Sequence, residues 1–103
     1  MDNVKIDIKK DQIEITKTGG KYILLRKLSQ DIEGNEYMAQ FSDEIVDDDI
    51  RRLVGTGVIE IMHHDFDTLL IIRTKRFHSA EMLYLIFADL LKHKISNPNN
   101  HEI

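Results

Sequence analysis

The residues best suited to chemistry lie together in the stretch MHHDFDTLL, residues 62–70. It holds His63, His64, Asp65 and Asp67 in close succession. Imidazole nitrogens and carboxylate oxygens are ligands that zinc, iron or manganese accepts, and a bound metal could support catalysis. On an extended strand His63, Asp65 and Asp67 would share one face, since side chains alternate. A metal-dependent enzyme built on this cluster is therefore one hypothesis.

The apolar runs on either side of this cluster favour a turn instead. If His64–Asp67 form a four-residue loop, Ile61 pairs with Leu70 and Ile59 with Ile72, so apolar residues face each other. Aspartate tolerates turn geometry and accepts hydrogen bonds from nearby amides, which explains the acidic residues without a metal. We therefore expect a turn here, no tightly bound metal and no catalytic residue.

The segment RTKRFH concentrates positive charge and is the second candidate. Arg73, Lys75, Arg76 and His78, with Phe77 among them, could contact phosphate or a nucleic-acid strand. The net charge of −4 disfavours a nonspecific grip on nucleic acid, which needs Lys and Arg along the phosphates. A nucleic-acid or phosphate ligand on this basic segment is therefore an alternative, and a solvated strand end is the preferred interpretation.

The remaining polar motifs indicate no cofactor. The acidic run VDDDIRR lacks the alternating oxygen ligands, central glycine and final glutamate of a calcium-binding loop, so helix capping explains it better. The short GTG and TGG sequences do not make a phosphate-binding loop. There is no cysteine, which excludes a thiolate metal site, a disulfide and a cysteine nucleophile.

The elements that must position these residues begin with strands. In VKIDI and QIEIT, apolar residues alternate with polar ones, which is the period of a half-buried strand. A loop at Lys9–Gln12 pairs Ile8 with Ile13 and Ile6 with Ile15, all on one face. The two segments therefore predict an N-terminal hairpin.

Two glycine-containing pairs predict two further hairpins. Gly19 and Gly20 suit a two-residue turn, and Gly34 with Asn35 suits another, because these residues adopt positive φ at low cost. The second turn predicts the antiparallel pairs Ile32–Tyr37, Gln30–Ala39 and Leu28–Phe41.

Two segments have the period of a helix. A short helix is expected at about Asp48–Val54, with Asp47 or Asp48 as its cap and Gly55 or Gly57 ending it. A longer one is expected at Ser79–His93, capped by Ser79.

The second helix is apolar nearly all round, and one small sheet covers only one side of it. A homodimer would cover the rest. The expected interface residues are Met82, Leu83, Leu85, Ile86 and Leu90.

Together these elements predict an α+β fold: an antiparallel meander of about six strands, a short helix after the fourth strand and a long C-terminal helix. The helix packs on the sheet or plugs an open barrel. The order is similar to that of a pleckstrin-homology barrel with one strand fewer, and no motif carries functional residues over. We expect one domain over residues 1–95 and a disordered tail over residues 96–103.

The function that these patterns favour is a small non-enzymatic binding or regulatory module. It would act on a protein partner, as an inhibitor, immunity or adaptor protein does. The longest apolar run, MLYLIF, is too short to cross a membrane, and no secretory leader pattern is visible. We therefore expect a cytoplasmic protein that binds no cofactor.

Overall fold

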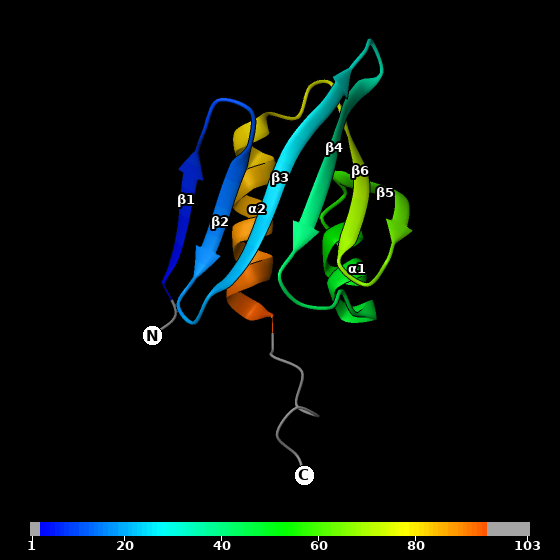
Figure 1. Cartoon of the computed structure of the whole chain (residues 1–103). Coiled ribbons are helices and arrows are strands. Elements are labelled where there is room, and N and C mark those ends of the chain that lie inside the picture. The colour runs from blue at the N-terminus through cyan, green and yellow to red at the C-terminus, as the bar shows by residue number, and fades with distance from the viewer. Residues whose placement is uncertain (1–2, 95–103) are drawn as a thin grey trace.

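The computed structural model describes residues 3–94, in which a six-stranded antiparallel sheet carries two helices on one face (Figure 1). The strands are β1 (Val4–Ile8), β2 (Ile13–Lys17), β3 (Lys21–Gln30), β4 (Gly34–Phe41), β5 (Ile59–Asp65) and β6 (Leu69–Lys75). The helices are α1 (Asp47–Gly55) and α2 (Ala80–His93). The predicted α+β meander, with a short helix after the fourth strand and a C-terminal helix on the sheet, is confirmed.

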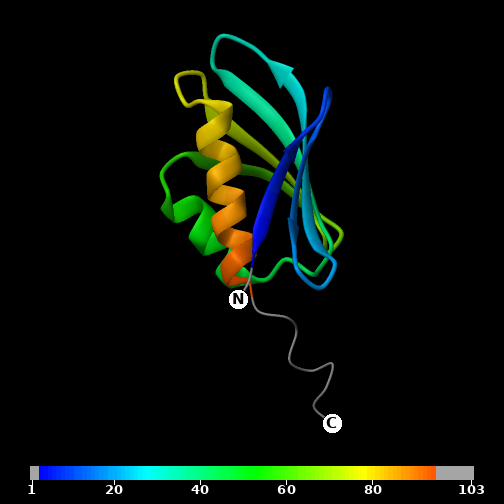
Figure 2. The ribbon, with the colours of Figure 1, turned by 90° about the vertical axis from the view of Figure 1, so that its left-hand side faces the viewer.

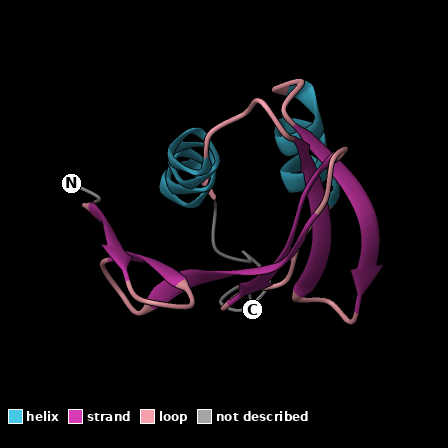
Figure 3. Cartoon of the chain, turned by 90° about the horizontal axis from the view of Figure 1, so that it is seen from above, coloured by secondary structure: helices cyan, strands magenta, loops and turns pink. Residues whose placement is uncertain are grey.

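The strand order is β1-β2-β3-β4-β6-β5, so β1 and β5 form the two edges. Viewed from above, the sheet is strongly bent and both helices lie inside the bend (Figure 3). The sheet therefore stays open rather than closing into a barrel, and α2 packs on β1, β2 and β3. The core between the layers includes Ile15, Ile23, Leu53, Leu70, Ile72 and Phe87.

The N-terminal hairpin has the predicted register, with Ile8 opposite Ile13 and Ile6 opposite Ile15. The next turn differs slightly from the prediction. Lys17 pairs with Lys21, which leaves a three-residue loop rather than a two-residue one. Gly19 and Gly20 both have positive φ, at 96° and 84°, as the sequence indicated.

The predicted register of the β3–β4 hairpin is wrong. Gly34 is already in β4, and the observed pairs are Gln30–Asn35, Lys27–Tyr37, Leu25–Ala39 and Ile23–Phe41. The turn is built by Asp31, whose carboxylate accepts hydrogen bonds from the amides of Glu33 and Gly34 at 2.9 and 3.0 Å. Ile32 is therefore in the turn and is exposed. A bulge at Leu28 shifts the register by one residue more, and Leu28 is exposed, whereas Phe41 is buried opposite Ile23.

The predicted register of the β5–β6 hairpin is also wrong. Ile61 pairs with Ile72 and Ile59 with Thr74, and a bulge at Met62 then brings His63 opposite Ile71. The strand continues to Asp65, so the loop begins at Phe66, which has a φ of 57°. The position of the loop explains the error, because the chain turns at residues 66–68 rather than at His64–Asp67, and the pairs next to the loop are already shifted before the bulge is reached.

Both helices lie where the sequence predicts, and their caps differ in detail. Ser79 caps α2 by accepting a hydrogen bond from the amide of Met82 at 3.1 Å. In α1 the capping residue is neither Asp47 nor Asp48. The carboxylate of Asp49, inside the first turn, accepts from the amide of Val46 at 3.0 Å. Gly57, with a φ of 75°, follows the helix end.

No helix within residues 3–94 is long and apolar enough to span a membrane. The expected tail at residues 96–103 lies outside the described residues.

Candidate functional site

The histidine–aspartate cluster is divided between the edge strand β5 and the following loop. His63, His64 and Asp65 are in β5, and Asp67 is in the loop. The closest approach is between His63 Nε2 and Asp65 Oδ2, at 3.4 Å, and both side chains are about half exposed. Within residues 3–94, no group of three His, Asp or Glu side chains is placed to hold a metal ion.

The basic segment, Arg73 to His78, is likewise divided between a strand and the loop that follows it. Arg73 is in β6, between Glu36 of β4 and Glu60 of β5, and its guanidinium lies 3.8 Å from Asp31 and 3.6 Å from Glu33. Arg73, which the sequence suggested as a phosphate-binding residue, is therefore surrounded by carboxylates.

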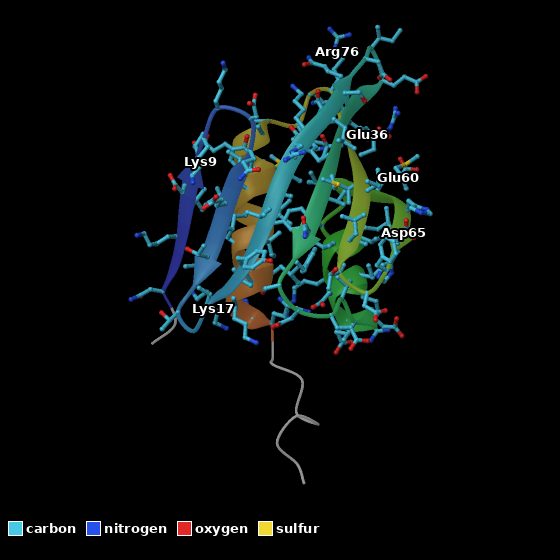
Figure 4. The ribbon with its side chains drawn as sticks, in the orientation of Figure 1. Lys9, Lys17, Glu36, Glu60, Asp65 and Arg76 are labelled. Carbon is cyan, nitrogen blue, oxygen red and sulfur yellow. The ribbon has the colours of Figure 1, made fainter. Side chains whose placement is uncertain are left out.

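The other basic residues lie at the end of the sheet. Lys75 ends β6, Arg76 lies beyond it beside the β3–β4 turn (Figure 4), and the His78 ring lies 4.4 Å from that of Phe77. A surface pocket of about 470 Å³ beside Arg73 and Lys75 also contains Glu33 and Glu60. The segment therefore does not form a continuous positive surface.

The five candidate interface residues of α2 point in different directions. Leu83 and Leu90 are each 1% exposed and belong to the core, so they are not accessible to a partner in this fold. Ile86 is partly buried against that core, whereas Met82 and Leu85 are exposed. The apolar residues of α2 point in nearly all directions, and only part of the apolar surface that they form is exposed.

The face of the sheet opposite the helices is a second open surface. Alternation along the strands places Leu24, Met38, Leu69 and Ile71 on this face, all of them half-buried. Glu36 and Glu60 lie farther along it (Figure 4). No helix or strand of residues 3–94 covers this convex face, so a strip of apolar side chains meets solvent there.

The two edges of the sheet differ in how far they are protected from pairing. Edge strand β5 contains the Met62 bulge and carries His63, His64 and Asp65, features that discourage pairing with another strand. Edge strand β1 has a regular register along its whole length and ends in Ile8, which is 68% exposed. Within residues 3–94, the β1 edge is therefore the one open to pairing.

Strand β1 has the sequence VKIDI, which is complementary to itself in the antiparallel direction. About a centre at Ile6, Lys5 faces Asp7 of a second strand, and Val4 faces Ile8. Neither Lys5 nor Asp7 forms an ion pair within the part of the chain that the structure describes. This symmetry can be read from the sequence alone. The strand order that places β1 at an edge of the sheet cannot.

No family model, curated protein or solved structure matches the chain. A functional assignment therefore depends on the surfaces described above.

Proposed function

We propose that this protein is a non-enzymatic binding module that acts through protein–protein contacts, and that it is a homodimer joined at edge strand β1. The observation that carries the proposal is the self-complementary, regular and exposed β1 strand. A two-fold symmetric dimer requires one patch to fit itself, and a palindromic edge strand meets that requirement.

The expected pairing is antiparallel and centred on Ile6. Lys5 of each copy then faces Asp7 of the other, and both ion pairs lie on the convex face. Val4, Ile6 and Ile8 lie on the other face, where β1 contacts α2. Opposite charges and apolar pairs across neighbouring strands each stabilise a sheet by about 0.2–1 kcal/mol, and the open backbone groups of β1 gain partners as well.

The position of α2 supports the same arrangement. A two-fold axis perpendicular to the sheet places both α2 helices on the same side of the joined sheet. Figure 2 looks onto the β1 edge and shows α2 alongside it. In the proposed dimer each α2 lies beside the interface, and the exposed Ile6 and Ile8 side chains gain cover there.

The convex face is the surface that we propose for a protein partner of the inhibitor, immunity or adaptor type. Its half-buried strip of Leu24, Met38, Leu69 and Ile71, with charged residues farther along, has the apolar centre and polar rim of a protein-binding surface. Joining two copies at β1 leaves this face open on both. We propose a cytoplasmic location, which the absence of cysteine supports.

The dimer is tested by sedimentation equilibrium from about 1 µM to about 1 mM, the range in which weak protein contacts dissociate. The mass should rise with concentration from the 12.0 kDa of one chain toward twice that value. Lys5→Glu sets Glu against Asp7 of the second copy, so it should weaken the dimer by roughly tenfold or more.

The matched control is the charge-swapped double variant Lys5→Glu/Asp7→Lys, which restores opposite charges across the same pair. It should dimerise about as tightly as the natural protein. A wild-type mass of 12.0 kDa at every concentration would overturn the homodimer.

A further inference from the structure

A pocket of about 460 Å³ opens at one end of the concave face of the sheet. It lies among the β1–β2 loop, β3, β4 and the first turns of α2. Figure 1 shows that the β1–β2 loop and the N-terminal end of α2 lie at the same end of the molecule. The volume falls within the roughly 300–1,000 Å³ that small-molecule sites occupy.

The floor of this pocket is apolar with two phenol groups. Ile13 and Leu25 are buried there, and the rings of Tyr37 and Tyr84 also line it. Tyr37 is only 4% exposed as a whole residue, and its hydroxyl forms no hydrogen bond among residues 3–94. A tyrosine hydroxyl ordinarily finds a partner when a ligand or protein group comes within reach, so this one is available to a ligand in the pocket.

The rim of the pocket is positively charged although the protein is acidic overall. Lys9, Lys10 and Lys27 line it, and Asp11 is the one acidic residue that residues 3–94 contribute to the lining. Lys9 is already paired with Glu14 at 3.0 Å, which also raises the pKa of Lys9, and Lys27 donates to Gln30 at 2.8 Å. Lys10 forms no ion pair within the described part of the chain.

We infer that this pocket binds a small carboxylic acid with an apolar or aromatic body. The body lies against Ile13, Leu25 and the tyrosine rings, and the carboxylate accepts hydrogen bonds from the hydroxyls of Tyr37 and Tyr84. Lys10 and Lys27 attract the negative charge from the rim. Burial raises the pKa of Tyr37 and of Tyr84, so both phenols stay protonated and act as donors near neutral pH.

The test is a titration followed through the backbone amide signals in NMR, with phenylacetate as the probe and uncharged phenylacetamide as its matched analogue. Phenylacetate should cause saturating shifts centred on residues 8–13, 25–27, 37 and 80–84. Phenylacetamide should bind roughly tenfold or more weakly, because it lacks the charge that the phenols and lysines favour.

The deciding variant is Tyr37→Phe, which removes the hydroxyl and keeps the ring. It should weaken phenylacetate by roughly tenfold, as the loss of a hydrogen bond to a charged group predicts. Tyr22→Phe is the control, since Tyr22 faces the convex side, and it should leave the affinity unchanged. Lys27→Gln, an exposed position, should weaken phenylacetate and not phenylacetamide.

Three results would overturn the inference. The first is an absence of saturating shifts, or shifts centred away from the pocket. The second is equal affinity for phenylacetate and phenylacetamide. The third is a Tyr37→Phe protein that is folded and binds phenylacetate as tightly as the Tyr22→Phe control.

Discussion

Gly34 shows how one residue can set the distance between two strands. It is paired with Lys75, and an added Cβ would collide with the backbone carbonyl oxygen of Thr74. Since that oxygen belongs to the main chain of β6, neither strand can yield without breaking the β4–β6 ladder. A glycine is therefore needed here for close approach and not for the positive φ that the predicted turn required.

Gly34→Ala should lower the free energy of unfolding by about 1–3 kcal/mol, the usual cost of overpacking. Gly55→Ala is a matched control, because Gly55 ends α1 and a Cβ there meets nothing within 4 Å. Gly55→Ala should leave the free energy of unfolding unchanged or raise it, since alanine favours the helical conformation more than glycine does. Urea denaturation measures both, and equal stability of the Gly34→Ala protein and the wild type would contradict the account.

Tyr37 should make the fold sensitive to alkaline pH. Burial, and then the nearby Tyr84, raise the pKa of Tyr37 above the ordinary value of 10.0, so the unfolded chain loses this proton first. The contribution to stability is complete below that ordinary value and is lost as pH rises toward the higher folded pKa.

Denaturation between about pH 8 and pH 11, a range spanning the ordinary tyrosine pKa, should show this decline. Tyr37→Phe should reduce the slope of stability against pH, and Tyr22→Phe should change it less. An identical slope in the wild type and Tyr37→Phe would show that the environment of Tyr37 does not favour the protonated form.

At the scale of elements, the two helices are joined by a buried ion pair. Lys94, just after α2, bonds to the carboxylate of Asp49 in α1 and to the carbonyl of Glu44 at 2.6 Å. The side chains of Lys94 and Asp49 are 5% and 6% exposed, and the same Asp49 carboxylate accepts from Val46 at the start of α1. The Asp49 carboxylate therefore caps the first turn of α1 and also holds the end of α2 against α1.

Asp49→Asn should cost about 3–5 kcal/mol, because it leaves the buried Lys94 ammonium without its counter-charge. Asp48→Asn is the matched control: Asp48 is one position away, pairs with Arg51 and is highly exposed, so its loss should cost less than about 0.5 kcal/mol. Chemical denaturation compares the two, and equal effects would contradict a role specific to the buried pair.

Edge strand β5 should tolerate the loss of its histidines. His63 and His64 are exposed, so replacing both with alanine should change stability by no more than about 0.5 kcal/mol. Elemental analysis of the purified protein should find no stoichiometric zinc, iron or manganese. Finding such a metal, and losing it on His64→Ala, would instead establish the metal hypothesis.

At the scale of the whole molecule, alternation and capping residues predicted the α+β meander, both helices and the β1–β2 register. The registers of the β3–β4 and β5–β6 hairpins were not predicted, because their loops lie at residues 31–33 and 66–68 rather than at Gly34–Asn35 and His64–Asp67. Bulges at Leu28 and Met62 then change each register by one residue and leave no mark on the polar–apolar pattern. The pocket around Tyr37 and Tyr84 was not predicted either. It depends on β1, β3, β4 and α2 meeting at one end, which a linear pattern does not express.

The central claim, a homodimer through β1, is tested most directly by mixing two charge variants. Lys5→Glu makes the strand doubly acidic and Asp7→Lys makes it doubly basic, so each alone faces like charges across the two-fold axis. In sedimentation each should stay closer to the 12.0 kDa monomer than the wild type does. An equimolar mixture of the two variants should recover a dimer as tight as wild type, because every charged pair is again opposite. A mixture that stays monomeric while the wild type dimerises would contradict pairing through β1.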